Sequence, residues 1–306
     1  MCGICGFTGY RQDQKTVIER MMKAIEHRGP DSEGSFCREK ITLGFRRLSI
    51  IDLEDGQQPM ESADGNLHIV FNGEIYDYKE LRAELEAFGI SFCTHSDTEV
   101  LINTIQQYGE KALDKLRGMF GFAVWNEKEQ TLMLARDFFG IKPVYYAEID
   151  GHFVFASEIK SILAFPGYER KVNQKALEQY LSFQYAPLEE TFFKGIYKLM
   201  PGHMLLDKNG NYEIKTYFKT KLTPGKWNRK TNMDQLRSQL AEILRDSVKH
   251  HMLSDVEVGA FLSGGVDSGY LASASGADQA FTVGFDEGDR YSEVNKAAKV
   301  AEKTGL

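Results

Sequence analysis

The chain has 306 residues, of which 42% are hydrophobic and 26% are charged, and its formal net charge is −7. This composition predicts a globular protein of two domains, and the interspersed charge excludes the basic surface with which proteins bind nucleic acid or anionic membranes. Four cysteines are too few for a disulfide framework. No apolar run reaches the roughly 18 residues of a membrane span, and the N-terminus lacks the basic and apolar regions of a signal peptide. We therefore expect a cytoplasmic protein with neither nucleic acid nor membrane as a partner.

The first part of the chain predicts antiparallel sheets with helices on the outside. Apolar residues at helical spacing predict helices at residues 14–26, 78–88, 158–165 and 173–183, and another that begins at Asp97. After an opening strand, strand patterns occupy residues 41–50, 67–71, 119–125, 131–137, 144–149 and 152–157. The tight connections between the last four strands predict one antiparallel meander. This order of elements predicts an α+β fold.

The second part follows a different pattern. Periodicity is lost after Pro201, and glycine and proline accumulate, so we expect a first domain over 1–205, a linker over 206–231 and a second domain over 232–306. Asn232 is positioned to cap an amphipathic helix. A near-continuous apolar strand at 256–262, a helix to about residue 273, a strand at 280–285 and a final helix predict the start of an α/β unit with a parallel sheet.

Cys2 is the first candidate for chemistry. Removal of Met1 would leave one residue with both a thiol and an α-amine, and such an amine can accept the proton of the thiol. Two other interpretations stay open: Cys2 and Cys5 as small buried residues, or as part of a zinc or redox site. Against the latter, neither Cys37 nor Cys93 brings a second pair of ligands at the usual spacing.

Five polar or flexible residues lie where predicted strands and helices end, and pockets form at such places. They are Arg47, Asn72, Gly73, Glu74 and Asp97. An arginine can grip a carboxylate, carboxylates can hold an ammonium, and an asparagine amide beside a glycine N–H can stabilise an oxyanion. Singly, each has an ordinary explanation as a solvated side chain, a turn or a helix cap. Together they favour a site for a free α-amino acid that carries a cleavable amide.

A second candidate site is the loop Ser263–Ser268, between a predicted buried strand and a helix. Its glycines allow close approach of an anion, and its N–H groups and the helix dipole favour phosphate oxygens. Asp267 is a candidate ligand for a Mg²⁺ ion that bridges phosphates. The loop is not a Walker loop, because it contains no lysine. The alternative is an ordinary glycine-rich turn.

With both sites in view, the sequence resembles the glutamine-hydrolysing asparagine synthetases over essentially its whole length. In that family an N-terminal-nucleophile (class II) glutamine amidotransferase domain precedes an ATP-pyrophosphatase domain. The matching motifs are Cys2-Gly3-Ile4, His27-Arg28-Gly29-Pro30-Asp31, Arg47-Leu48-Ser49-Ile50, Phe71-Asn72-Gly73-Glu74-Ile75-Tyr76, Ser96-Asp97-Thr98-Glu99, Leu116-Arg117-Gly118-Met119-Phe120, Arg136-Asp137, Gly140-Ile141-Lys142-Pro143, Phe155-Ala156-Ser157-Glu158 and Phe261-Leu262-Ser263-Gly264-Gly265-Val266-Asp267-Ser268. The implied fold is a sandwich of two antiparallel sheets flanked by helices, followed by an α/β domain.

The resemblance implies roles for the first site. Cys2 would attack the side-chain amide of glutamine to form a thioester, with its own α-amine as the base. Asn72 and the Gly73 N–H would form the oxyanion hole, and Arg47 would hold the α-carboxylate. Glu74 and Asp97 would hold the α-ammonium. The backbone of Leu48, Ser49, Ile50 and Ile51 would line the pocket.

The resemblance also implies that ammonia passes to a second site, where ATP activates aspartate. The products would be asparagine, AMP, pyrophosphate and glutamate. Ser263, Gly264, Gly265, Val266, Asp267 and Ser268 would bind the pyrophosphate, with Mg²⁺ at Asp267 and the backbone of Leu262 and Val283 near the adenosine. A homodimer is implied as well.

The sequence departs from the family pattern in two ways. The family's synthetase domain continues well beyond the phosphate loop, so we expect a C-terminally truncated synthetase half. Gly269 stands where the family usually has serine or another small polar residue. Three alternatives follow: a glutaminase-only fragment, an amidotransferase for another carboxylate acceptor, or a non-catalytic remnant that dimerises.

Overall fold

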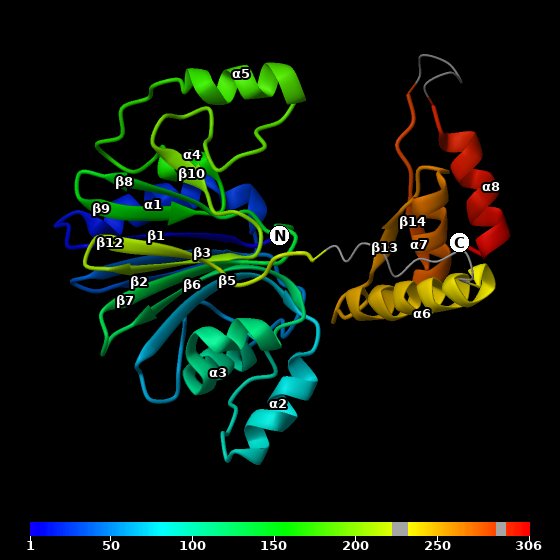
Figure 1. Ribbon diagram of the computed structural model, residues 1–306. Helices are drawn as coiled ribbons and strands as arrows, with labels where there is room; N and C mark the ends of the chain where they lie inside the picture. The colour runs from blue at the N-terminus through cyan, green and yellow to red at the C-terminus, as the bar shows by residue number, and fades with distance from the viewer. Residues whose placement is uncertain (222–231, 286–291) are drawn as a thin grey trace. The chain divides into compact units, whose positions relative to one another are not determined.

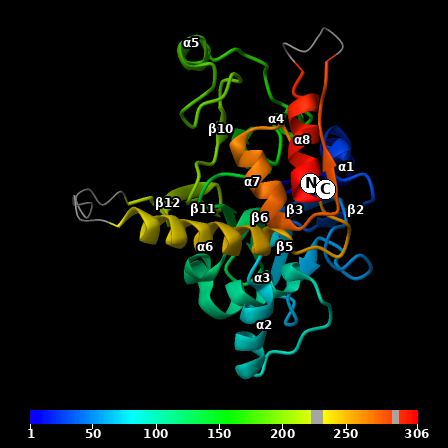
Figure 2. The ribbon, with the colours of Figure 1, turned by 90° about the vertical axis from the view of Figure 1, so that its right-hand side faces the viewer.

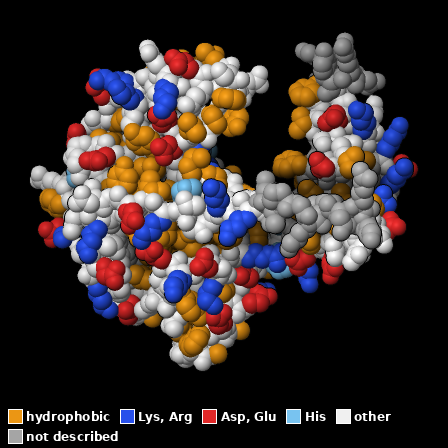
Figure 3. All heavy atoms as spheres, in the orientation of Figure 1, with side chains coloured by type: hydrophobic (Ala, Val, Ile, Leu, Met, Phe, Trp, Pro, Cys, Tyr) orange, Lys and Arg blue, Asp and Glu red, His pale blue; other side chains and the backbone are white. Residues whose placement is uncertain are grey.

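The computed structural model describes residues 1–221, 232–285 and 292–306. The chain divides into two compact units, Met1–Thr220 and Lys221–Leu306 (Figure 1). Within the described residues, no helix is both long enough and apolar enough to cross a bilayer. Acidic and basic side chains are interspersed over the face that Figure 3 shows.

The first unit, which is described throughout, contains two six-stranded antiparallel sheets. One has the order β10-β8-β9-β1-β3-β2, and the other has the order β12-β11-β7-β6-β5-β4. The strands of the first sheet are β1 (Gly3–Thr8), β2 (Ser32–Cys37), β3 (Ile41–Arg47), β8 (Tyr145–Ile149), β9 (His152–Ala156) and β10 (Ile196–Lys198). Those of the second are β4 (Met60–Glu61), β5 (Leu67–Ile75), β6 (Gly118–Asn126), β7 (Thr131–Arg136), β11 (His203–Lys208) and β12 (Asn211–Thr216). This confirms the predicted α+β fold.

The predicted four-stranded meander is wrong. β6 and β7 pair in one sheet, whereas β8 and β9 pair in the other. The segment 137–144, between β7 and β8, crosses from sheet to sheet. A short connection requires only that the ends of two strands lie close together. Strands in two packed sheets meet this requirement as well as hydrogen-bonded neighbours in one sheet do, so a short connection does not predict pairing.

Helices cover the outer faces of the two sheets, as both ribbon views show (Figures 1 and 2). On one side lie α1 (Gln14–Ala24), the short η1 (Glu26–Arg28) and α4 (Ile159–Ile162). On the other lie α2 (Tyr78–Ala87), α3 (Asp97–Tyr108) and η2 (Gly109–Lys115), while α5 (Gln174–Phe183) follows α4 in the chain. The helix α3 begins where the Ser96 hydroxyl caps the Thr98 N–H.

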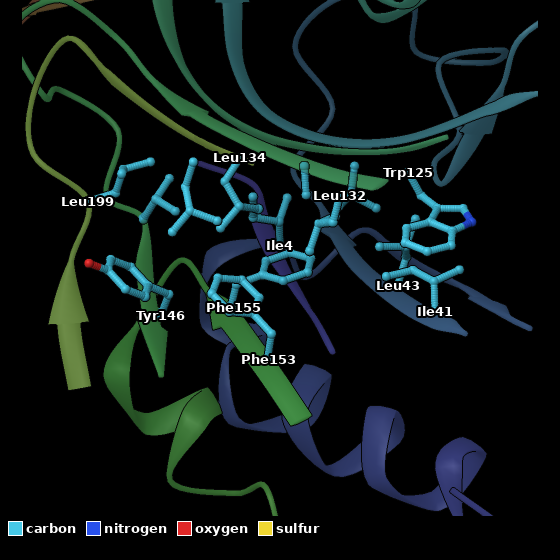
Figure 4. Packing of buried hydrophobic residues seen from close by; sticks show 14 of the residues in the cluster. Ile4, Ile41, Leu43, Trp125, Leu132, Leu134, Tyr146, Phe153, Phe155 and Leu199 are labelled. Atoms are coloured by element: carbon cyan, nitrogen blue, oxygen red, sulfur yellow. The ribbon is translucent and has the colours of Figure 1, made fainter. Parts of the chain in front are cut away.

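Two hydrophobic clusters hold this unit together. Residues from both sheets form the first, which includes Ile4, Leu43, Leu134 and Phe155 (Figure 4). The second lies between the first sheet and α1, where Ile18 and Met21 are fully buried. Because β1 supplies alternate residues to both clusters, this strand is enclosed on both faces.

The first unit extends beyond the predicted boundary at residue 205. The hairpin β11–β12 completes the second sheet, so residues 206–220 belong to the first unit rather than to a linker. β12 is mostly exposed, and its period-2 pattern is limited to Tyr212 and Ile214 between polar residues, too short to predict a strand. The remaining part of the expected linker, 222–231, lies outside the described residues.

The segment that follows β12 is fastened to the end of β7. The Tyr217 hydroxyl donates to the Arg136 carbonyl. The Phe138 ring lies 5.8 Å from the Tyr217 ring and 4.7 Å from the Phe218 ring, measured between centroids. These contacts tie the last residues of the first unit to the crossing segment 137–144.

The second unit contains α6 (Met233–His251), β13 (Gly259–Phe261), α7 (Val266–Ser275), β14 (Gln279–Phe281) and α8 (Val294–Thr304). β13 and β14 are parallel, as predicted, but both are shorter than the strands predicted at 256–262 and 280–285. Asn232 caps α6 by accepting from the N–H groups of Asp234 and Gln235. Among the described residues, the fully enclosed part of its core is Leu262, Ala272 and Ala297.

Candidate active site

A pocket in the first unit gathers nearly all the residues predicted for the first site. They come from the start of β1, the end of β3 and its following loop, the end of β5 and the start of α3. The pocket is lined by Cys2, Arg47, Leu48, Ile50, Ile51, Asn72, Gly73, Glu74 and Asp97, together with Met1, Phe45, Gly56, Gln58, Phe71, Ser96, Thr98 and Lys142. Ser49 does not line it; its N–H donates to the Asp31 carboxylate at 2.8 Å.

The Cys2 thiol sits at the wall of this pocket, between the N-terminus and the loop after β3. The Leu48 N–H lies 3.4 Å from Cys2 Sγ, and the Leu48 carbonyl lies 3.5 Å from it. Burial raises the pKa of the thiol, while the hydrogen bond from Leu48, the N-terminal amine, Arg47 and Lys142 oppose that rise. The pocket therefore contains groups that favour the thiolate.

Cys5 cannot work with Cys2, because the two residues face opposite sides of β1. Cys2 packs against the cluster between the sheets, whereas Cys5 is buried in the cluster under α1. Burial raises the pKa of Cys5 to about 12, so this thiol stays protonated. This geometry disfavours the zinc and redox interpretations, and the described residues contain no group of three potential metal ligands.

The backbone at Cys2 is held by a charged network. Arg28 Nε donates to the Cys2 carbonyl at 2.9 Å, and Arg28 Nη1 donates to Glu158 at 2.9 Å. Burial alone would raise the pKa of Glu158, but hydrogen bonds from Arg28, His27 and Lys160 bring it to about 2. Glu158 is therefore ionised at neutral pH and keeps Arg28 oriented toward the Cys2 carbonyl.

The two adjacent arginines at the end of β3 point to opposite faces, as strand geometry requires. Arg46 pairs with Glu26 and Glu33 outside the pocket. Arg47 is buried in the pocket wall, where its guanidinium donates to the carbonyls of Ile51, Asp52 and Leu53. These bonds fix a cation in the pocket wall.

The end of β5 supplies two hydrogen-bond donors. Asn72 is buried, and its side-chain Nδ2 has no hydrogen-bond partner among the described residues. N–H groups of alternate residues in a strand point to the same edge. The N–H groups of Phe71 and Ile75 leave the sheet to reach Gln58 and Asp97, so the N–H of Gly73, between them, points to the same edge.

Only glycine fits at position 73. A Cβ atom there would lie 2.2 Å from the Met119 carbonyl oxygen and 2.8 Å from Phe120 Cα. Because both neighbours are backbone atoms of the paired strand β6, they cannot move aside easily. The glycine therefore lets β5 pair closely with β6 beside the pocket.

Two acidic residues line the pocket, Glu74 and Asp97, and both are buried. Asp97 Oδ2 accepts from the Ile75 N–H at 3.0 Å. Burial raises the pKa of Asp97 to about 7, and the charge on Glu74 adds to the rise. Two carboxyl groups in one enclosed place favour a ligand with a positive charge.

Lys142 and Gln58 are among the pocket residues to which the sequence assigned no role. Lys142 belongs to the motif Gly140-Ile141-Lys142-Pro143, and the sequence pattern does not reveal that this lysine is buried. Gln58 connects two elements, because its amide donates to the Thr98 hydroxyl and accepts from the Phe71 N–H. A lysine directly before a proline in an otherwise apolar segment was the available signal for Lys142.

The second predicted site lies in the second unit. Leu262 follows β13, Val283 lies just beyond β14, and carboxyl ends of parallel strands are the usual place for nucleotide ligands. The Ser268 hydroxyl accepts from the Ser263 N–H at 3.2 Å, and the two hydroxyl groups are 2.9 Å apart. Gly264 has φ +75°, and a Cβ there would lie 2.7 Å from Lys296 Cβ.

The loop leads into α7 with Gly265 at the N-cap. Asp267 lies in the first turn of this helix, and both Asp267 and Val266 are exposed. One carboxylate at a phosphate loop suits Mg²⁺, which usually takes one or two protein ligands and completes its shell with phosphate and water. The residues therefore fit a nucleotide with its cation.

Comparison with known proteins agrees with this geometry. The sequence pattern of the glutamine amidotransferase domain matches residues 1–218. The chain therefore belongs to the glutamine amidotransferase family, the class that the two-sheet fold and the N-terminal cysteine pocket define. Within that class, residues 239–306 match the pattern of asparagine synthase.

Relatives and solved structures extend the comparison. Asparagine synthetase (glutamine-hydrolyzing) 1 of Bacillus subtilis is 43% identical over 316 residues, which cover 99% of this chain and 49% of the relative. The amidase chry2 of Gibberella zeae is 33% identical over 340 residues, and the match covers 100% of this chain and 50% of the relative. The chain thus spans about half the length of these relatives. Glutamine phosphoribosylpyrophosphate amidotransferase of B. subtilis has a TM-score of 0.55 at 18% identity, covering 94% of this chain and 68% of that chain, and this likeness concerns the fold alone.

Proposed function

We propose that the first unit hydrolyses the side-chain amide of glutamine to glutamate and ammonia. The observation that carries the proposal is the buried Asn72 amide, which has no partner among the described residues and lines the same pocket as Cys2. A buried donor without an acceptor is costly, and an oxyanion that forms at Cys2 would supply the acceptor.

The pocket carries charges of both signs, which suit the two charged groups on the α-carbon of a free amino acid. Arg47 is the cation for the α-carboxylate, and Glu74 and Asp97 are the anions for the α-ammonium. The backbone of the loop after β3, at Leu48, Ile50 and Ile51, forms the wall along the substrate. Glutamine fits this pattern because it carries both charged groups and an amide.

The reaction begins when the α-amine of Cys2, freed of Met1, takes the thiol proton. The sulfur attacks the amide carbon, and Asn72 and the Gly73 N–H hold the oxyanion. When the C–N bond breaks, the protonated amine returns its proton to the leaving nitrogen, so ammonia departs and a γ-glutamyl thioester remains. Water then attacks the thioester, releases glutamate and restores the thiol.

Substitution of the nucleophile tests this proposal. We expect Cys2→Ala to lower glutamate release by at least about 10³-fold, and Asn72→Ala by about 10²–10³-fold in kcat. Coupled detection of glutamate measures both. Cys37→Ala, at a partly exposed cysteine outside the pocket, is the matched control and should keep wild-type activity. Equal glutamate release by wild type and Cys2→Ala would refute the proposal.

The role of the α-amine requires removal of Met1. While Met1 is attached, the Cys2 nitrogen is a peptide amide without a basic lone pair. We expect the intact mass of the active protein to lack one methionine. Normal glutamine hydrolysis by a protein that retains Met1 would overturn the N-terminal-amine mechanism.

We further propose that the ammonia aminates aspartate activated by ATP, giving asparagine, AMP and pyrophosphate. The match of residues 239–306 and the phosphate loop after β13 support this step. Ser263–Ser268 would bind the phosphates, Leu262 and Val283 would contact the adenosine through their backbone, and Mg²⁺ would bind at Asp267. AMP formation that requires both aspartate and glutamine tests it; the absence of such AMP would contradict it.

A homodimer and a cytoplasmic location complete the proposal. The support for both is the likeness to the family rather than a contact in the structure. Sedimentation equilibrium distinguishes a dimer from a monomer, and fractionation of the source cells tests the location.

A further inference from the structure

Lys142 is a buried cation in the wall of the amide-cleaving pocket. Lys142 is 5% exposed, and it lines the pocket together with Cys2, Glu74 and Met1. Its backbone is fixed on both sides. The Lys142 N–H donates to Asp137 at 2.9 Å, and its carbonyl accepts from Arg136 Nε at 2.8 Å. The side chain therefore leaves from a rigid point.

The Lys142 ammonium has no ion pair or hydrogen bond with any described residue. A buried charge without a partner destabilises a folded protein. Burial accordingly lowers the pKa of Lys142, although the charge on Glu74 and the Cys2 sulfur oppose this. Packing alone does not explain the residue, because methionine would fill similar space without a charge.

The groups that face Lys142 come from several elements. Cys2 and the N-terminal amine approach from the start of β1, Glu74 from β5, Arg28 from η1 and Asp137 from its own segment. One of these groups, the Cys2 thiol, is the proposed nucleophile. The N-terminal amine belongs to Met1, and removal of Met1 would expose the proposed base, the α-amine of Cys2. A fixed positive charge favours the ionised form of a thiol and the neutral form of an amine.

We propose that Lys142 is a further electrostatic residue of the glutaminase site, where its charge stabilises the Cys2 thiolate and keeps the adjacent α-amine unprotonated. This inference rests on the proposed hydrolysis of glutamine. Both effects act in the direction that the reaction requires, since the nucleophile must be anionic and the base must be free. Lys142 thus prepares the two groups before the substrate binds.

The competing role for Lys142 is to neutralise Glu74. The two roles predict different kinetics. Loss of a partner for Glu74 would disturb the site for the α-ammonium and change KM. Loss of charge beside Cys2 would lower kcat and leave KM nearly unchanged, because the grip on the substrate's α-carboxylate and α-ammonium is intact.

The experiment measures alkylation of Cys2 by iodoacetamide as a function of pH, read on the N-terminal peptide by mass spectrometry. We expect Lys142→Met to raise the pH midpoint of alkylation by about one unit or more and to lower kcat by about tenfold. Lys142→Arg should keep the wild-type midpoint, and Lys142→Gln should behave as Lys142→Met does.

Lys198→Met is the matched control. Lys198 is another partly buried lysine whose pKa is lowered by burial, but its ammonium donates to the Ala186 carbonyl and does not line this pocket. Its alkylation midpoint and kcat should equal those of the wild type. An unchanged midpoint in both Lys142→Met and Lys142→Gln would overturn the inference, as would a change in KM alone.

The alkylation readout does not depend on glutamine hydrolysis. A shifted midpoint in a protein that releases no glutamate would refute the proposed function while confirming the electrostatic effect of Lys142 on Cys2. Active protein with an unshifted midpoint would refute the role of Lys142 and leave the proposed function standing.

Discussion

The buried carboxyl group of Asp97, which we propose binds the α-ammonium of the substrate, lowers the stability of the folded protein when it is ionised. The side chain is buried at the start of α3, and burial raises its pKa from 3.8 to about 7. The folded protein therefore holds this proton more tightly than the unfolded chain does. Its contribution to the free energy of unfolding is largest below pH 3.8 and is lost as the pH rises through about 7, with a slope of about 1.4 kcal/mol per pH unit between them.

Asp97→Asn tests this cost directly. We expect the variant to unfold at higher urea concentration than the wild type at pH 8, and at a similar concentration at pH 4. The reason is that asparagine imitates the protonated carboxyl. The same variant should raise KM for glutamine, because the α-ammonium loses a carboxylate. A variant less stable than the wild type at pH 8 would contradict the assignment.

At the residue scale, the sequence revealed the groups that lie at strand and helix ends. Arg47, Asn72 and Asp97 were predicted for the site because their chemistry in combination suits an α-amino acid amide, and the structure places all three in one pocket. Gln58 could not be predicted, and the sequence around Lys142 offered only a weak signal, because the places of both residues depend on burial by segments distant in the chain.

At the element scale, β1 is the strand that positions Cys2, the proposed nucleophile. The Ile4 N–H donates to the Ser157 hydroxyl at 3.0 Å, and the Ser157 N–H donates to the Ile4 carbonyl at 2.8 Å. Both residues are fully buried. This reciprocal pair anchors β1 two residues after Cys2, just past the end of β9.

Ser157→Ala removes the acceptor for a buried N–H. We expect a loss of about 1–3 kcal/mol in the free energy of unfolding, together with lower glutaminase activity as β1 loosens. Urea titration measures the first and glutamate release the second. Ser182→Ala, at an exposed serine in α5, should change stability by less than about 0.5 kcal/mol. Equal stability of the two variants would refute the anchoring role.

Local pattern predicted the elements well, but not their pairing. The helices that begin at Gln14 and Asp97 and the strands from Ile41 and Thr131 follow from hydrophobic period and capping residues. The division of β6–β7 and β8–β9 between two sheets, and the inclusion of β12 in one of them, depend on contacts between distant segments. Periodicity contains no information about these.

At the scale of the whole molecule, the two units differ in how much core each has. In the first unit, two large clusters enclose β1 on both faces. In the described part of the second unit, large apolar residues such as Phe261, Val266 and Val283 are mostly exposed. The apolar runs there predicted longer strands than the structure forms, because a two-stranded sheet offers few partners.

Residues 1–220 expressed alone test the independence of the first unit. We expect this fragment to fold cooperatively and to hydrolyse glutamine with a kcat/KM close to that of the full chain, because every residue that lines the pocket belongs to it. Calorimetry and glutamate release are the measurements. An insoluble or inactive fragment would show that the second unit is needed for the pocket.

The packing of Tyr217 and Phe218 against Phe138 connects the end of the first unit to the segment that contains Lys142. The neighbouring Asp137 carboxylate accepts from the N–H groups of Phe139, Ile141 and Lys142. The last residues of the first unit and the backbone of Lys142 are therefore held by the same short segment, 137–144. A displacement of Tyr217 or Phe218 would therefore change the packing of Phe138, the residue next to the carboxylate that holds the Lys142 backbone.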